Sequence, residues 1–176
     1  NDTLDKVILR RMMEEEDGLA ILGEYGAGYK VAVLMALFIQ MFRFAAEPFF
    51  FERAKHVDSK KTYAVVMKYF IIAMLLVYLA INLYLSGFQY IIGKDFRGAL
   101  GVVPIVAMGC LLYGIYINHS IWYKLTDLTI FGIYITLIGA LVTVIINVLL
   151  IPGYGYMASA WAHVASYGSM IIMSFI

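Results

Sequence analysis

Long apolar stretches separated by short polar segments dominate the pattern of this chain. A stretch of about 20 mostly apolar residues is long enough to cross the hydrocarbon core of a bilayer as a helix. We expect a transmembrane helix in each of five stretches: residues 31–51, 69–85, 99–121, 131–151 and 157–176. The apolar runs do not alternate with polar residues as the strands of a membrane barrel do. The pattern therefore predicts an all-α fold, a polytopic transmembrane helix bundle.

The segments between these stretches contain residues typical of turns. Residues 13–30 hold an acidic run followed by four glycines, and we expect a connecting loop there. Pro48 is expected to bend or end the first helix. The run Pro152-Gly153-Tyr154-Gly155 predicts a tight turn between two antiparallel helices. Residues 1–12 carry apolar side chains at helical spacing, and we interpret them as the end of an earlier helix.

Composition indicates the same class of protein. Hydrophobic residues make up 63% of the 176 residues and charged residues 14%. A typical soluble domain has about 45–50% and about 25%, respectively. The mean hydropathy is +0.85. These values exclude a soluble enzyme, a nucleic-acid-binding protein and a disordered chain. The formal net charge of +1 leaves no basic excess to attract nucleic acid.

The density of cations in the loops indicates an orientation. Alternation of the loops places residues 52–68 and 122–130 on one side of the membrane, and residues 1–30, 86–98 and the Pro152 turn on the other. Each group carries six Lys and Arg residues, but five of the first group lie within residues 52–68. Because short cytoplasmic loops are enriched in Lys and Arg, residues 52–68 are predicted to be cytoplasmic.

The most polar positions inside an apolar stretch are Gln40, Arg43 and Glu47, just before Pro48. Their spacing places all three on one helix face. An arginine near the bilayer centre costs roughly 2.5–3.5 kcal/mol on insertion scales, so Arg43 must face a partner or a water-filled cavity. We interpret Arg43 as a cation in a solute pathway, paired at rest with Glu47. The alternative is an Arg43–Glu47 pair that only fixes helix packing.

Two further stretches carry polar stripes. One runs along residues 131–151: Thr136, Ala140, Thr143 and Asn147. Small and hydroxyl-bearing residues favour close helix packing, so we favour a packing role for Asn147 over a place in the substrate path. The other runs along residues 157–176: Ser159, His163, Ser166 and Met170. His163 is a candidate proton relay, although a histidine hydrogen-bonded within the bundle is the commoner arrangement.

Sequence motifs for covalent chemistry are absent. No phosphate-binding glycine-rich loop, no HExxH and no cluster of His, Asp and Glu at metal-ligand spacing occurs in the sequence. The single cysteine, Cys110, lies in an apolar run and has no second cysteine with which to form a disulfide. We therefore expect no enzyme activity, no metal site and no cofactor. The tyrosines at 113 and 116 offer aromatic faces on which sugar rings can stack.

Several segments resemble a known family of transporters. They are residues 1–10 (NDTLDKVILR), 23–30 (GEYGAGYK), 42–51 (FRFAAEPFFF) and 121–127 (IWYKLTD). These segments resemble the second half of polysaccharide flippases. Such proteins export lipid-linked oligosaccharides and belong to the multidrug/oligosaccharidyl-lipid/polysaccharide exporter superfamily. The resemblance runs over essentially the whole chain.

The resemblance implies about twelve or more helices in two pseudo-symmetric bundles around a central cavity. This chain would be the second bundle, a C-terminal-half fragment that needs the N-terminal bundle of the same protein as its partner. The family moves undecaprenyl-diphosphate-linked oligosaccharide across the bacterial inner membrane by alternating access, for polysaccharide or lipopolysaccharide biosynthesis. By this likeness Arg43 would meet the diphosphate, and Asp5 and Lys30 would lie at the cavity wall or its periplasmic mouth.

Two other functions stay open from the residues alone. A cation-coupled multidrug antiporter of the same superfamily would need a carboxylate inside the membrane that exchanges a proton or sodium ion, and Glu47 is the candidate. A non-transporting membrane scaffold would use the Arg43–Glu47 pair for stability only. The expected partners are a lipid-linked oligosaccharide and membrane lipids, with no nucleic acid.

Overall fold

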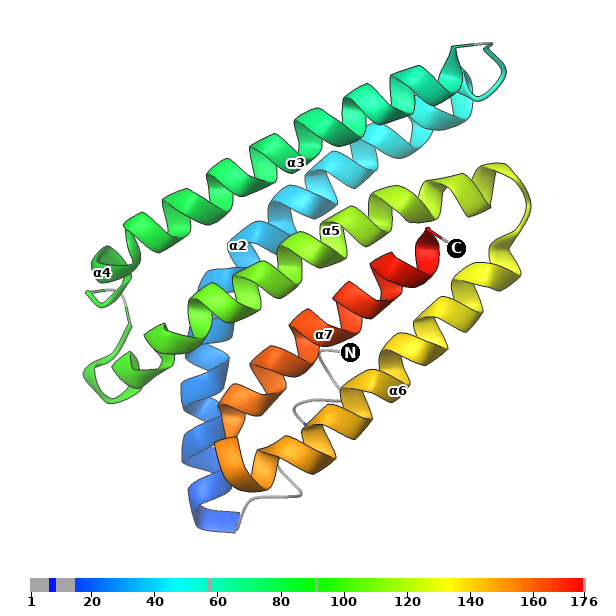
Figure 1. Ribbon diagram of the computed structural model, residues 1–176. Helices are drawn as coiled ribbons and strands as arrows, with labels where there is room; N and C mark the ends of the chain where they lie inside the picture. The colour runs from blue at the N-terminus through cyan, green and yellow to red at the C-terminus, as the bar shows by residue number, and fades with distance from the viewer. Residues whose placement is uncertain (1–6, 9–14, 57, 91, 176) are drawn as a thin grey trace.

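The computed structural model describes residues 7–8, 15–56, 58–90 and 92–175, and helices account for most of them (Figure 1). The elements in chain order are α2 (Glu15–Arg53), α3 (Ser59–Leu83), the short α4 (Leu85–Phe88), the 3₁₀ helix η1 (Lys94–Val102), α5 (Val103–Leu125), α6 (Thr129–Tyr154) and α7 (Tyr156–Ser174). The described residues contain no strand. The predicted all-α helix bundle is therefore confirmed.

Four helical segments among the described residues are long and apolar enough to cross a membrane: Gly23–Arg53, Ser59–Leu83, Phe96–Leu125 and Thr129–Tyr154. They cover most of the first four stretches predicted from the sequence. Large apolar side chains also stay on the outside of the bundle, as α6 shows with the exposed residues Ile133, Leu137 and Leu141. An apolar surface of this kind is favourable in contact with lipid and unfavourable in contact with water. The chain is accordingly a multi-pass membrane protein.

The fifth predicted span is present as the 19-residue helix α7, which is less apolar than the other four. Its polar residues Ser159, His163 and Ser166 are buried. α7 packs most extensively against α6 and α5, so these side chains face neighbouring helices. A helix whose polar groups face protein can occupy the membrane with a lower hydropathy. The span at 157–176 stays a prediction.

One expectation about the connecting segments is wrong, and two others need correction. Residues 15–30 form no loop, because α2 runs without interruption from Glu15 to Arg53. Gly28 allows close packing of two helices: it lies against the backbone of Ala99 in η1. Pro48 does not end the first helix, since α2 continues for five residues beyond it; a bend at Pro48 stays a prediction. The predicted turn is confined to its last residue, Gly155, because α6 continues through Pro152 to Tyr154, and the φ of 55° at Gly155 separates α6 from α7.

The predicted end of an earlier helix, residues 1–12, lies outside the described residues except for Val7 and Ile8, which are helical.

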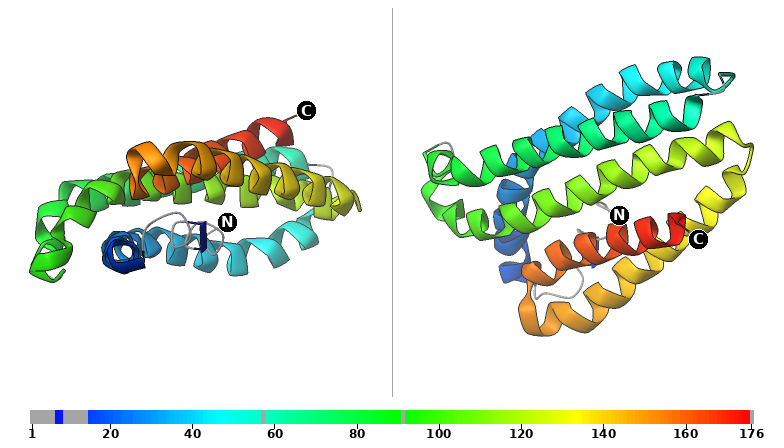
Figure 2. Two further views of the ribbon diagram at one scale, coloured as in Figure 1. Left: turned by 90° about the horizontal axis from the view of Figure 1, so that it is seen from below. Right: turned by 45° about the horizontal axis from the view of Figure 1, so that its top comes forward.

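α5 lies at the centre of the bundle and packs against α2, α3 and α7. The main core forms where these helices meet, with Ile39 from α2, Phe70 from α3 and Val106 from α5 all buried. In Figure 2 α2 lies in one layer, with α5, α6 and α7 in a second layer over it.

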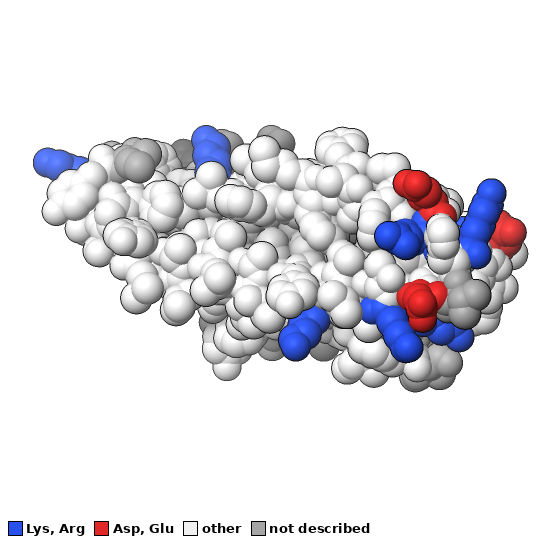
Figure 3. Space-filling view, turned by 90° about the horizontal axis from the view of Figure 1, so that it is seen from above, with Lys and Arg blue, Asp and Glu red and all other residues white. Residues whose placement is uncertain are grey.

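Charged side chains gather at one end of the bundle, where the α2–α3 and α5–α6 connections lie (Figures 1 and 3). We refer to this region as the charged end and define it by its ten ionisable residues: Arg43, Arg53, Lys55, Lys60, Lys61 and Lys124, with Glu47, Glu52, Asp58 and Asp127. The predicted cytoplasmic location of residues 52–68 would place this end in the cytoplasm.

Packing at Gly28 generates a first prediction. A Cβ atom at Gly28 would lie 2.5 Å from the backbone carbonyl oxygen of Ala99, whereas one at Gly26 meets nothing within 4 Å. Because backbone cannot rotate aside, Gly28→Ala must separate α2 from η1, and we expect a loss of about 1–3 kcal/mol in the free energy of unfolding. Gly26→Ala should be neutral or stabilise by about 0.5–1 kcal/mol, since alanine suits a helix better.

Thermal unfolding of the purified full-length protein in detergent measures both variants. Equal unfolding temperatures for Gly28→Ala and Gly26→Ala would contradict the close approach of α2 to η1.

Candidate functional site

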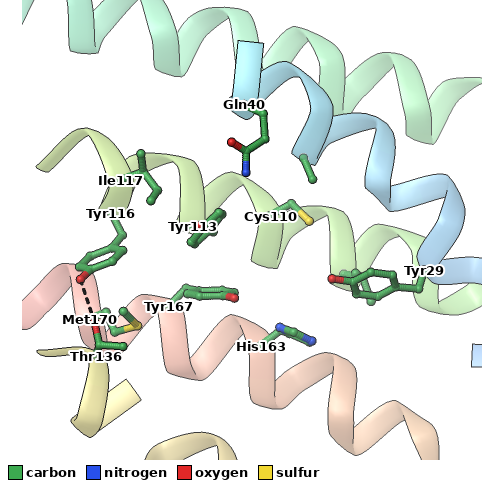
Figure 4. Close-up of a pocket in the computed structure, with 12 residues that line it drawn as sticks. Tyr29, Gln40, Cys110, Tyr113, Tyr116, Ile117, Thr136, His163, Tyr167 and Met170 are labelled. Carbon is green, nitrogen blue, oxygen red and sulfur yellow. Dashed lines mark hydrogen bonds between the residues drawn. The ribbon is translucent and has the colours of Figure 1, made fainter. Parts of the chain in front are cut away.

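A cavity of about 480 Å³ lies between α2, α5, α6 and α7, away from both ends of the bundle (Figure 4). This volume falls within the range of about 300–1,000 Å³ that is usual for small-molecule sites. Four tyrosines and three other polar side chains contribute to its wall: Tyr29, Tyr113, Tyr116, Tyr167, Gln40, Thr136 and His163. We call it the tyrosine-lined cavity.

The wall of this cavity carries hydroxyl, amide and imidazole groups but no carboxylate, ammonium or guanidinium group among its described lining residues. Hydroxyl and amide groups both donate and accept hydrogen bonds. The cavity therefore suits an uncharged molecule that is rich in hydrogen-bonding groups. An ionised molecule would find no counter-charge on this wall.

The aromatic rings form a connected row across the cavity, from α2 through α7 to α5. The ring of Tyr29 lies 6.1 Å from that of His163, which is stacked at 5.8 Å on Tyr167. Tyr167 in turn lies 5.1 Å from Tyr113. His163 and Tyr167 are four residues apart and share one face of α7. Such contacts hold each ring in one orientation, which gives the cavity a preformed wall.

Two of the site residues predicted from the sequence meet in this cavity. Gln40 reaches it from α2 and His163 from α7 (Figure 4). The two residues lie 123 positions apart in the chain, and the packing of both α2 and α7 against α5 brings them to one cavity. His163 is 3% exposed, so this histidine is both a buried residue of the bundle and a cavity residue.

Asn147 lies elsewhere, in a buried polar seam between α6 and α7. Its Oδ1 accepts a hydrogen bond from Ser159 Oγ at 2.9 Å. Farther along the seam, Ser166 Oγ donates to the Gly139 carbonyl oxygen at 2.8 Å. Both side chains of the Asn147–Ser159 pair are wholly buried, and neither lines the cavity. Asn147 therefore contributes to the packing of α6 against α7.

Arg43 and Glu47 form an ion pair that a third residue completes. Arg43 Nε donates to Glu47 Oε1 at 3.3 Å, and Lys124 Nζ from α5 donates to the same oxygen at 2.5 Å. These side chains are 37%, 27% and 38% exposed, respectively. Two cations share one carboxylate, so the trio has a formal charge of +1. We call it the charge cluster; it ties α2 to α5.

The charge cluster lies nearer the helix ends than a position in the middle of residues 31–51 would be. Lys124 belongs to the last turn of α5, and its bond to Glu47 sets both at the level of that helix end. Arg43 is one turn farther in, and Gln40 one turn beyond that, at the cavity wall. With a rise of 1.5 Å per residue, Arg43 lies about 15 Å from the end of α2 at Arg53.

The remaining candidates do not join these groups. Lys30 is exposed and lines a separate apolar pocket beside Phe88 and Phe96, toward the opposite end of the bundle from the charge cluster. It lies 13 residues from Arg43 along α2, or about 20 Å. Asp5 lies outside the described residues. The structure thus distributes the predicted site residues over the cavity, the seam, the charge cluster and a distant pocket.

Several residues of these sites were not among the sequence candidates. Tyr167 follows His163 by four positions, so their shared helix face was a usable signal. Tyr29 lies within the GEYGAGYK segment, which was expected to form a loop. Lys124 was expected in a loop as well, and it lies 77 residues from Glu47. No local pattern connects residues at that separation.

Metal chemistry has no support in the part of the chain that the structure describes, where no group of three or more His, Cys, Asp and Glu residues could hold an ion. Compared with known proteins, the chain matches no family model, no curated protein and no solved structure. Membership of the polysaccharide flippases therefore stays a prediction from the sequence segments that resemble them.

The charge cluster generates a second prediction. Glu47→Gln leaves Arg43 and Lys124 close together without their shared carboxylate. An exposed ion pair contributes about 0–1 kcal/mol to the free energy of unfolding, and removing one partner of a buried pair lowers it by about 3–5 kcal/mol. Because the charge cluster is partly buried, we expect Glu47→Gln to lower the free energy of unfolding by about 1–3 kcal/mol. The matched control is Asp58→Asn, whose partner Lys61 lies 3.8 Å away with both side chains largely exposed. It should change stability by less than about 0.5 kcal/mol.

A double-mutant cycle between Glu47→Gln and Lys124→Gln, measured by thermal unfolding in detergent, isolates the contact between α2 and α5. Additive effects of the two substitutions would show that Glu47 and Lys124 do not interact.

Proposed function

We propose that this chain is part of a transporter that flips an undecaprenyl-diphosphate-linked oligosaccharide across the bacterial inner membrane, for polysaccharide or lipopolysaccharide biosynthesis. The observation that carries the proposal is the uncharged, tyrosine-lined cavity within a bundle of apolar helices. A sugar ring has apolar faces and hydroxyl edges. A tyrosine offers the same combination, an apolar ring with one hydroxyl, and therefore matches it.

The charge cluster supports the proposal because it is the part of the charged end that lies nearest the cavity along α2. Along α2, Gln40 lines the cavity and Arg43 is three residues farther on, beside Glu47 and Lys124. A guanidinium group matches phosphate oxygens through paired hydrogen bonds. In this arrangement the glycan occupies the cavity and the diphosphate meets Arg43, with the lipid chain outside the bundle.

The resemblance to flippases implies a second bundle, formed by the N-terminal half of the same protein. That bundle would cover the cavity on the side of α2 and would supply the alternating access that one bundle lacks. The partner of this chain would then be its own N-terminal half, and neither half would transport alone.

The antiporter alternative is less well supported. A coupling carboxylate must release and rebind a proton or sodium ion, but Glu47 already accepts hydrogen bonds from two cations. Its ionised form is thereby stabilised by its partners. The scaffold alternative accounts for the charge cluster but gives no reason for a cavity walled by hydroxyl and amide groups.

Substitution of Tyr167 tests the cavity. The full-length gene is expressed in a strain that lacks its own polysaccharide flippase, and surface glycan is measured at matched membrane abundance. Tyr167→Ala removes the ring that contacts both His163 and Tyr113. We expect surface glycan to fall on the order of tenfold, which corresponds to a loss of about 1.4 kcal/mol in the free energy of substrate binding. Tyr167→Phe keeps the ring and should retain most of the activity.

The matched control is Tyr134→Ala, because Tyr134 is 62% exposed on the outer face of α6 and does not line the cavity. It should restore glycan as the wild type does. Equal restoration by Tyr167→Ala and Tyr134→Ala would remove the cavity from the substrate path.

Substitution of Arg43 in the same strain separates the three functions. A flippase with Arg43 on its path loses surface glycan with Arg43→Ala and keeps part of it with Arg43→Lys, which retains the charge. A scaffold would lose only membrane abundance, and an antiporter would depend chiefly on Glu47. Full restoration by Arg43→Ala would leave the flippase proposal standing and remove Arg43 from its site. A well-expressed wild type that restores no glycan would favour the antiporter.

A further inference from the structure

A second cavity, of about 430 Å³, opens between α3 and α5 at the charged end. It shares no lining residue with the tyrosine-lined cavity. Its wall includes Lys60, Tyr63 and Met67 from α3 and Ile121 and Trp122 from α5. We call it the α3–α5 groove. It plays no part in the proposed flippase site.

The groove changes in polarity with depth. Lys60 is the second residue of α3, and Trp122 lies three residues before the end of α5, so both stand at the mouth. Met67 is seven residues farther along α3, about 10 Å toward the middle of the bundle. A cation at the helix ends and apolar side chains below it match the polarity of a phospholipid, which has a phosphate above an acyl chain.

The inner wall of the groove is fixed by contacts of its own. Tyr63 donates its hydroxyl to the Phe50 carbonyl oxygen at 3.0 Å, and its ring meets that of Phe50 edge-on at 4.9 Å. Asn118 Nδ2 donates to the carbonyl oxygen of Gly114 at 3.4 Å. Tyr63 and Asn118 are therefore engaged within the protein. His119, the other polar residue of the inner wall, packs its ring edge-on against Phe175 at 4.4 Å. The remaining wall is apolar.

Lys60 differs from these residues. It is exposed, and it forms no ion pair with any described residue, whereas its neighbour Lys61 pairs with Asp58. The charged end as a whole has six cations against four carboxylates. An anion at the mouth of the groove therefore gains a counter-charge without breaking an existing pair.

The exposed ring of Trp122 also suits this position, since tryptophan is enriched where membrane meets water. We propose that the α3–α5 groove binds an anionic phospholipid of the leaflet at the charged end, with its phosphate on Lys60 and an acyl chain beside Tyr63, Met67 and Ile121. The site is independent of what the protein transports.

Fluorescence quenching by brominated lipid tests this site. The full-length protein is reconstituted in phosphatidylcholine bilayers that contain increasing fractions of dibrominated phosphatidylglycerol or dibrominated phosphatidylcholine. The signal of Trp122 is the difference between the protein and its Trp122→Phe variant. The signal of Trp161, an exposed residue of α7 that lines neither cavity, is obtained in the same way and reports general contact with lipid.

We expect Trp122 to reach half-quenching at an about fivefold lower fraction of the brominated anionic lipid than of the brominated neutral lipid, the factor that one lysine contributes near an anionic membrane surface. Trp161 should show no such preference. Lys60→Gln should abolish the preference at Trp122. Lys55→Gln removes the same charge from the same end but lies outside the groove, and it should leave the preference intact.

Two results would overturn the proposal. They are equal quenching of Trp122 by both lipids and a preference that survives Lys60→Gln.

Discussion

The close packing of α5 against three other helices is the interaction on which the rest of the structure depends. Glycines on α5 permit it: a Cβ at Gly114 would lie 2.9 Å from Phe70 and 3.1 Å from Ile39, and one at Gly109 would lie 3.1 Å from His163 Cβ. In lipid, where helices gain little from the hydrophobic effect on association, such small residues allow the van der Waals contact that holds helices together. Both cavities border α5, so the same packing shapes them.

Polar side chains inside the bundle divide into groups with different consequences. The seam of Asn147 and Ser159 is closed, because its groups bond to one another and are wholly buried. The polar groups around His163 border a cavity instead of a closed helix interface. The charge cluster lies between these extremes, partly exposed near a helix end, where its cost in the membrane is lower than at the bilayer centre.

The two cavities relate differently to the membrane. The tyrosine-lined cavity is uncharged and lies among four helices, which suits a polar solute that must be shielded from lipid. The α3–α5 groove opens at the charged end and carries a lysine above apolar walls, which suits a lipid already present in the bilayer. A transporter of a lipid-linked sugar would use both sites, but the lipid binding proposed for the groove does not depend on that function.

The sequence by itself determined the helical class, the approximate spans and the Arg43–Glu47 pair. Each depends on neighbours at most seven positions apart, or on the apolar length that a bilayer requires. The tertiary structure decided that the segment before Lys30 is helical with Gly28 packed against η1, and that Lys124 completes the charge cluster. It also decided that Gln40 and His163 line one cavity while Asn147 does not. These outcomes depend on helix contacts between residues 71 to 123 positions apart, and no local periodicity encodes which faces meet.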